Sequence, residues 1–228
     1  MSLAGRDLEE AAVALEAAGF VLAGGRSSRM GADKALMPLA GQPLAGYALA
    51  ALREAGLSVS IAGAHTTLGA LAPVVEDAEP DRGPLGGICA ALSSTSAHWT
   101  VFLPVDLPLL PASLVGFLLN HAKITGAAVT VPSVNGFAQT FPAVIDREAL
   151  PGLKNELDAG RGGCFAAFQA AARHLGRPVS IVAVEPLVQC RQLAHPDALP
   201  ATRWFLNVNR PQDLRRAETH LSGALRVI

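Results

Sequence analysis

The residues best suited to chemistry lie in one stretch near the N-terminus, where an apolar run gives way to glycines and then to cations. Residues 20–22 form a short apolar run, which is typical of the end of a buried strand. The glycine pair at 24–25 permits backbone N–H groups to approach an anion closely, because no Cβ intervenes. Three cations that could neutralise a nucleoside triphosphate follow this pair: Arg26, Arg29 and Lys34.

The spacing of this loop excludes two familiar phosphate-binding motifs. A P-loop needs Lys directly after its second Gly and then Ser or Thr, whereas Ala32 and Asp33 separate Gly31 from Lys34. The dinucleotide fingerprint G-x-G-x-x-G does not fit residues 24–26. Two interpretations stay open: a phosphate loop of a different kind, or a plain turn flanked by surface cations.

Two aspartates follow other predicted strands. Asp77 comes after the apolar pair 74–75, at the strand end where open α/β sheets bind ligands; the alternative is a solvated acid or a helix cap. Asp106 follows the buried strand predicted at 99–103 and lies in a loop that three prolines stiffen. A rigid carboxylate at a strand end suits Mg²⁺, which also binds phosphate oxygens and water.

The predicted elements alternate between strands and helices, which indicates an α/β fold. A strand ending at 22, a helix over 43–55 and a strand at 59–62 imply parallel pairing through a right-handed crossover. The strand predicted at 139–145 contains Pro142, which cannot donate to a ladder, so we expect it to be antiparallel or at an edge. The other predicted elements are a helix at 7–17, a strand at 74–75, a helix from 85 or 88 to 94, a helix at 114–121, a strand at 127–132, a helix from 164, a strand at 181–184, a long loop at 185–202 and a helix from 211.

Composition limits the functions open to the chain. The 228 residues carry 18 basic and 19 acidic side chains, and this balance provides no general field for binding nucleic acid or a membrane surface. The three cysteines lack the spacing of a zinc site or a disulfide framework. We expect one domain over residues 1–228, with a helical extension at 1–17. Neither a membrane span nor a signal peptide is indicated, so a cytoplasmic protein is predicted.

The loop at 22–36 resembles the signature of the molybdenum cofactor guanylyltransferases, a family within the GT-A-like nucleotidyltransferases. Three later stretches extend the resemblance. Asp77 with residues 83–88, and then 102–108, are similar to the nucleotide loop and the Pro-x-Asp-x-Pro metal motif of that family, and residues 205–214 are similar to its Asn-x-Asn-x-Pro ending. The resemblance implies a three-layer α/β/α fold with a mostly parallel, Rossmann-like central sheet of the nucleotide-diphospho-sugar transferase type.

The activity that the resemblance implies is transfer of GMP from GTP to the phosphate of molybdenum cofactor (molybdopterin), with release of pyrophosphate and with Mg²⁺ as cofactor. Arg29 would contact pyrophosphate, Lys34 the α-phosphate, and Asp106 the metal, with Asn209 completing the metal shell or binding the acceptor phosphate. The nucleotide-binding residues would be Leu22, Ala23, Gly24, Gly25, Arg26, Ser27, Ser28, Lys34, Asp77, Gly83 and Asp106. The acceptor-binding residues would be Gln139, Pro142, Arg161, Asn207 and Asn209.

Two other functions stay open at this point. One is a sister nucleotidyltransferase that uses CTP or a different phosphate acceptor; the other is a non-catalytic nucleotide-binding protein. The Leu-Ala-Gly-Gly form of the loop favours GTP by resemblance, but residues 62–64 lack an Asn that family members often carry. We expect a monomer or weak homo-oligomer, with possible transient contact to other molybdenum cofactor biosynthesis proteins.

Overall fold

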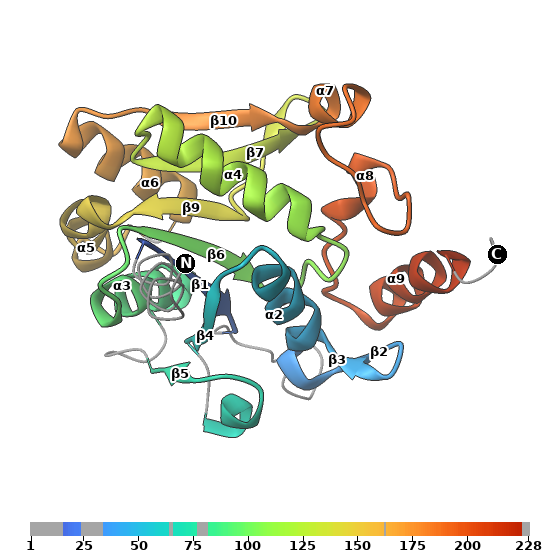
Figure 1. Cartoon of the computed structure of the whole chain (residues 1–228). Coiled ribbons are helices and arrows are strands. Elements are labelled where there is room, and N and C mark those ends of the chain that lie inside the picture. The colour runs from blue at the N-terminus through green and yellow to red at the C-terminus, as the bar shows by residue number, and fades with distance from the viewer. Residues whose placement is uncertain (1–15, 24–33, 64–65, 77–81, 162, 225–228) are drawn as a thin grey trace, which may run out of the picture.

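A twisted, mostly parallel sheet runs through the centre of the molecule (Figure 1). The computed structural model describes residues 16–23, 34–63, 66–76, 82–161 and 163–224, with side chains to 221. The strand order is β10-β7-β9-β6-β1-β4-β5, with β8 paired to β7. The strands are β1 (Ala17–Leu22), β4 (Ser58–Ala62), β5 (Val74–Val75), β6 (Trp99–Pro104), β7 (Val129–Val134), β8 (Phe137–Ala138), β9 (Ala143–Asp146) and β10 (Val179–Ala183).

Helices cover both faces of this sheet, and a small ribbon of β2 (Pro38–Leu39) and β3 (Gln42–Pro43) precedes the first of them. The helices are α2 (Leu44–Glu54), α3 (Gly83–Ser94), α4 (Ala112–Thr125), α5 (Leu150–Asp158), α6 (Cys164–Leu175), α7 (Val184–Gln189), α8 (Ala201–Trp204) and α9 (Pro211–Ala224). Short 3-10 turns are η1 (Lys34–Leu36), η2 (Thr66–Ala70) and η3 (Arg147–Ala149).

The central strands divide the apolar residues between two cores, because successive side chains of a strand point to opposite faces. Val21 of β1 packs in the core that α2, α4, α7 and α8 cover. Phe20 points to the other core, under α3, α5 and α6, where its ring lies 6.0 Å from that of Phe102. Gly19 lets α2 press closely on β1, since a Cβ there would lie 3.2 Å from the Leu52 side chain.

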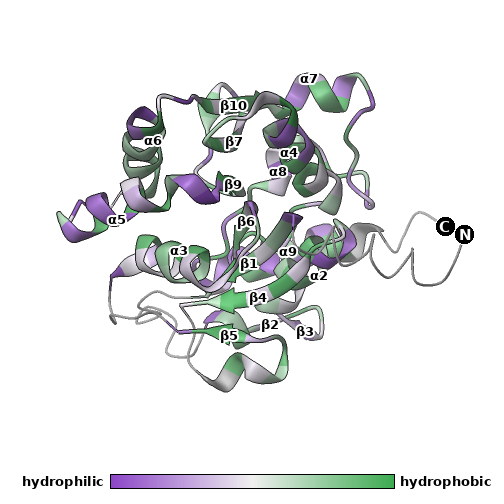
Figure 2. Cartoon of the chain, turned by 60° about the vertical axis from the view of Figure 1, so that its left-hand side comes forward, coloured by the Kyte–Doolittle hydropathy of each residue, from purple (hydrophilic) through white to green (hydrophobic). Residues whose placement is uncertain are grey.

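The hydropathy of the exposed and covered elements follows this layering. Figure 2 shows β4 mainly in the hydrophobic colour, whereas α5 carries hydrophilic stretches. The burial pattern agrees, since the last residues of β4 are buried and most of α5 is exposed or half-buried. The apolar strands therefore lie inside, and the polar faces of the helices form the surface.

The observed sheet confirms the predicted three-layer α/β/α architecture and the parallel pairing of β1 with β4. β9 is antiparallel, which confirms the expectation of an antiparallel or edge strand, and it lies between β6 and β7 in the middle of the sheet. The expectation of an edge came from Pro142, and this residue precedes the strand, which begins at Ala143. The ladder of β9 therefore needs no backbone N–H from Pro142.

Other predictions need correction. The segment predicted as a long loop at 185–202 contains most of α7 and the start of α8. α5 was not predicted, and α3 begins at Gly83, earlier than expected. β1 begins at Ala17, so the predicted helix at 7–17 cannot extend that far; residues 1–15 lie outside the described part of the chain.

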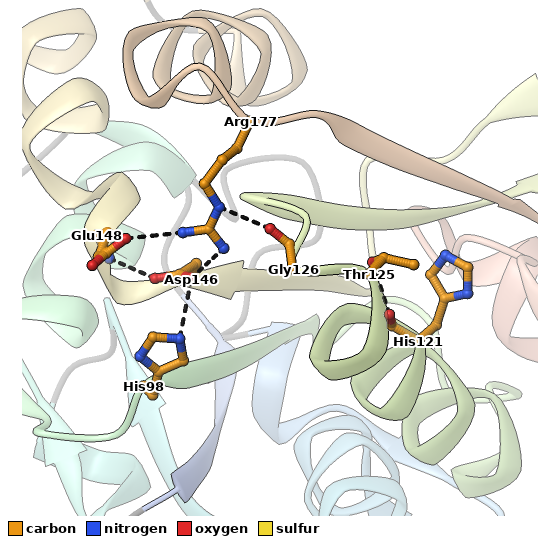
Figure 3. Close-up of polar contacts among 7 residues, drawn as sticks. All are labelled: His98, His121, Thr125, Gly126, Asp146, Glu148 and Arg177. Atoms are coloured by element: carbon orange, nitrogen blue, oxygen red, sulfur yellow. Dashed lines mark hydrogen bonds and ion pairs between the residues drawn. The ribbon is translucent and has the colours of Figure 1, made fainter.

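A polar cluster joins several loops at the edge of the sheet where β6 begins (Figure 3). The Asp146 carboxylate is fully buried and accepts hydrogen bonds from Arg177 Nη2 at 2.6 Å and from Glu148 N at 2.8 Å. His98 Nε2 lies 3.2 Å from the same carboxylate. Arg177 also donates to the carbonyl of Gly126, the αL residue that ends α4, at 2.8 Å. The cluster thus fixes the ends of α4, β9 and α6 relative to β6.

Asp146→Ala should lower the free energy of unfolding by about 3 kcal/mol, because removal of one partner leaves the other charge of a buried pair uncompensated. Glu148→Ala is the matched control, since it removes a carboxylate that also binds Arg177 but is 64% exposed. That variant should lose less than about 1 kcal/mol. Urea denaturation measures both values, and equal losses would show that burial of Asp146 is not what makes the cluster important.

Candidate functional site

The predicted phosphate loop and the predicted metal loop leave the sheet side by side. β1 pairs in parallel with β6, and Leu22 at the end of one strand lies opposite Pro104 at the end of the other. The pairing continues past the strands, because Val105 N donates to the carbonyl of Leu22 at 3.2 Å. The loops that follow therefore start from one point at the carboxyl edge of the sheet, where open α/β folds bind ligands.

Three of the predicted site residues meet at this edge. Lys34 Nζ donates to Asp106 Oδ2 at 3.0 Å and to Asn209 Oδ1 at 2.5 Å. The Lys34 side chain is 17% exposed and that of Asp106 is 23% exposed, so the pair is largely removed from solvent while still accessible. A charge-assisted contact of this kind is stronger than one in open water. The Lys34 ammonium group thus contacts both a carboxylate oxygen and an amide oxygen.

The position of Asn209 depends on two backbone anchors. Its neighbour Val208 is buried and donates its N–H to the carbonyl of Asp106 at 2.9 Å. Asp213, in the first turn of α9, accepts from the backbone N–H groups of Asn209 at 3.1 Å and of Arg210 at 2.9 Å. This is the backward half of a capping box. Asp213 thus provides the capping contact of α9, whereas the Asn209 side chain binds Lys34.

The rest of the predicted nucleotide site is described only in part. Leu22 is buried and Ala23 half-buried at the end of β1, while residues 24–29 and Asp77 lie outside the described residues. Gly83 is the first residue of α3 and has a φ of +66°, which favours glycine. A groove of about 580 Å³ runs between α3 and α5 from this end. Its lining includes Glu76, Arg82, Cys89, Lys154 and Leu157.

The predicted acceptor residues are spread over several elements. Asn207 is exposed beside Asn209, with the buried Val208 between them. Gln139 is half-buried and donates to the carbonyl of Phe137 at 3.1 Å, and Pro142 is buried. None of the hydrogen bonds between described residues connects Gln139 or Pro142 to Lys34 or Asp106. The structure therefore does not unite these residues with the Lys34 site by direct contact.

Arg161 is engaged elsewhere. Its Nε and Nη2 donate to the two carboxylate oxygens of Glu156 at 2.7 and 2.9 Å. This bidentate hydrogen bond, together with the charge of Arg161, lowers the pKa of Glu156, and Glu156 in turn raises the pKa of Arg161. To receive an anionic substrate, Arg161 would have to leave this carboxylate.

Cys164 is one further reactive side chain among the described residues. Burial raises the pKa of the Cys164 thiol to about 11, so it is protonated at neutral pH and a poor nucleophile. Among the described residues, no three His, Cys, Asp or Glu side chains gather in a way that could hold a metal ion. In the same part of the chain, no helix has both the length and the apolar character needed to cross a membrane.

Comparison with known proteins identifies the family. The model of the MobA-like NTP transferase domain matches residues 19–175, which span β1 to α6 and include Lys34 and Asp106. The chain belongs to this family. The recognition made from the loop at 22–36 is thereby confirmed.

Relatives of this MobA-like chain include two proteins named molybdenum cofactor guanylyltransferase. The one from Vibrio atlanticus is 31% identical over 204 residues, which are 87% of this chain and 94% of the relative. The one from Xanthomonas euvesicatoria is 48% identical over 107 residues, which are 46% of this chain. The matched region spans about half of that second relative, 54% of its length.

Solved structures share the fold of this MobA-like chain. Molybdopterin-guanine dinucleotide biosynthesis protein A from Archaeoglobus fulgidus has a TM-score of 0.71 at 20% identity, covering 90% of this chain and 98% of its own. A Mycobacterium tuberculosis protein solved in complex with manganese has a TM-score of 0.61 at 21% identity. The match covers 90% of this chain and 98% of that protein. Identities this low establish the common fold and nothing further.

A double-mutant cycle tests the central contact of this MobA-like site. Lys34→Met combined with Asn209→Ala should show a coupling of about 0.5 to 1 kcal/mol in the free energy of unfolding, the range for a partly exposed hydrogen bond. Asn207→Ala is the matched control, because Asn207 is also an exposed asparagine and lies on the other side of the buried Val208 from Asn209. Its coupling to Lys34→Met should stay below about 0.3 kcal/mol. Equal coupling for the two asparagines would contradict the observed geometry.

Proposed function

We propose that this protein transfers GMP from GTP to the phosphate of a molybdenum-bearing pterin and releases pyrophosphate. The observation that carries the proposal is the meeting of Lys34, Asp106 and Asn209 at the carboxyl edge of β1 and β6. Membership of the MobA-like NTP transferase family supports transfer of a nucleotidyl group, and the names of the two guanylyltransferase relatives support guanine and the pterin acceptor.

The reaction matches the side chains that this chain offers. An oxygen of the acceptor phosphate attacks the α-phosphorus, the bond from that phosphorus to the bridging oxygen breaks, and pyrophosphate leaves with the bonding electrons. Because the acceptor oxygen is already anionic, little proton abstraction is needed, and catalysis consists of positioning and charge stabilisation. This fits the described part of the site, which contains a cation, a carboxylate and an amide.

Asp106 and Asn209 fit a divalent cation. A carboxylate oxygen and an amide oxygen are ligands that Mg²⁺ prefers, and both already face the positive charge of Lys34 Nζ. The two residues would hold Mg²⁺, which when bound supplies positive charge to the phosphate oxygens. Manganese in the structural relative from Mycobacterium tuberculosis supports a divalent ion for the fold.

The other assignments follow from the same arrangement. Lys34 would turn from Asn209 towards the α-phosphate, and Arg29 would bind pyrophosphate. Backbone groups of residues 22–28, with Asp77 and Gly83, would bind the nucleotide. Gln139, Pro142, Arg161, Asn207 and Asn209 would receive the acceptor, provided that Arg161 exchanges the Glu156 carboxylate for an anionic substrate.

Nucleotide choice is a direct test of guanine recognition, because residues 62–64 lack an Asn that family members often carry. With Mg²⁺ present, GTP should bind at least about tenfold more tightly than CTP, ATP or UTP, a difference of about 1.4 kcal/mol. Isothermal titration calorimetry with all four nucleotides measures this. Equal binding of all four, or a preference for CTP, would overturn the assignment of guanine.

Turnover of purified variants tests the roles of the charges. Lys34→Ala and Asp106→Ala should each lower kcat by at least about 10², as loss of one preorganised charge does in other enzymes. Lys123→Ala is the matched control and should leave kcat unchanged, because this lysine lies in the last turn of α4 and pairs with Glu16. Circular dichroism must show that each variant is folded, and full activity in either site variant would mean that the roles are wrong.

A further inference from the structure

A buried histidine contacts the loop that carries Asp106. His195 lies in the segment between α7 and α8 and is only 9% exposed. Its Nε2 is 3.0 Å from the carbonyl oxygen of Leu109, a residue of the Asp106 loop, which follows β6 at 105–111. Ser113, at the start of α4, donates to the carbonyl of the adjacent Ala194 at 2.8 Å. The segment around His195 is therefore attached directly to the Asp106 loop and to the helix that follows it.

The hydrogen bonds determine the tautomer of the ring. Asp197 N donates to His195 Nδ1 at 3.0 Å, so Nδ1 carries a lone pair and no proton. A neutral imidazole then has its proton on Nε2, which donates to Leu109 O. Burial lowers the pKa of His195, although the bond to Leu109 and the charge of Asp197 act in the opposite direction. Both ring nitrogens are thus satisfied in the neutral form.

The far end of the Asp106 loop depends on this bond. The near end is already held, because Val105 N binds the Leu22 carbonyl and Val208 N binds the Asp106 carbonyl. Leu109, at the far end, is buried, and its carbonyl accepts the hydrogen bond from His195. Without a donor at this place, a buried carbonyl would lose its partner, and the loop would be free to shift towards another one.

We propose that His195 is a positioning residue for the reaction: it holds the carbonyl of Leu109 and thereby keeps the Asp106 carboxylate directed at Lys34 and at a bound divalent cation. His195 contacts no substrate itself and acts only through the loop. The role of the cation rests on the function proposed above, whereas the anchoring of the loop does not. The competing explanation is a buried histidine that stabilises the fold and has no influence on Asp106.

Two substitutions separate these explanations, because each keeps a different one of the two hydrogen bonds. His195→Asn places an oxygen near the position of Nδ1, so it retains the bond from Asp197 N and loses the bond to Leu109. His195→Gln is longer and places an N–H near the position of Nε2, so it retains the bond to Leu109 and loses the other. Each variant loses one neutral hydrogen bond, so urea denaturation should show a small loss of stability in both, and a larger one in His195→Asn because the Leu109 carbonyl is buried.

The Mg²⁺ concentration for half-maximal turnover is the first measurement. His195→Asn should raise it at least about tenfold, the effect typical of losing a residue that orients a metal ligand, whereas His195→Gln should stay near the parent protein. His121→Asn, which removes a histidine contact to Ser180 remote from the loop, is the control and should change nothing. Equal shifts in the Asn and Gln variants, or no shift in either, would overturn the proposal.

Amide hydrogen exchange without substrate is the second measurement and separates this inference from the proposed function. His195→Asn should speed exchange in residues 105–111 and at Val208, and His195→Gln should not. If the parent protein shows no Mg²⁺-dependent turnover but this exchange pattern appears, the proposed function fails while the anchoring role stands. If exchange at 105–111 is unchanged in His195→Asn, the anchoring role is wrong whatever the activity.

Discussion

The parallel pairing of β1 with β6 is the constraint on which the rest of the structure depends. Because Leu22 lies opposite Pro104, the chain leaves both strands at the same edge, and Lys34 and Asp106 can meet although 72 residues separate them. Gly19 and the two apolar faces of β1 allow helices to pack closely on this pair. The two cores thus hold the ends of β1 and β6 in register. The loops that carry Lys34 and Asp106 start from these strand ends.

The charges at this edge are balanced within the chain itself. Lys34 lies between a carboxylate and an amide oxygen, and this arrangement compensates a partly buried ammonium group that would otherwise lose much of its hydration. The folded chain therefore compensates the charge of Lys34 through its own side chains.

Much of this arrangement could be predicted from local sequence, and the rest could not. The strands β4, β5 and β6 follow from short apolar runs, and the loop of Asp106 from its prolines, because these signals lie within a few residues. The central place of β9 was missed because strand order depends on pairing between distant segments. α7 was missed because it is only six residues long and contains Pro186, and the composition there favours a loop.

The same distinction applies to the site. Lys34, Asp106 and Asn209 were recognisable because they stand in motifs of fixed spacing. Asp213 could have been recognised from its position in the first turn of a helix that begins at Pro211, whereas His195 has no local signal at all. Its partners Leu109 and Asp197 become meaningful only once the chain has folded, since one of them lies 86 residues away.

The contact between Lys34 and Asn209 joins residues 175 positions apart. During synthesis, the segment containing Lys34 emerges from the ribosome long before Asn209 is added. Loop closure over such a distance follows the formation of local structure. A nascent chain that has formed most of the sheet still lacks Asn209 Oδ1, which accepts from Lys34. The contact between Lys34 and Asn209 can therefore form only after the segment that precedes α9 has been made and has folded against the Asp106 loop.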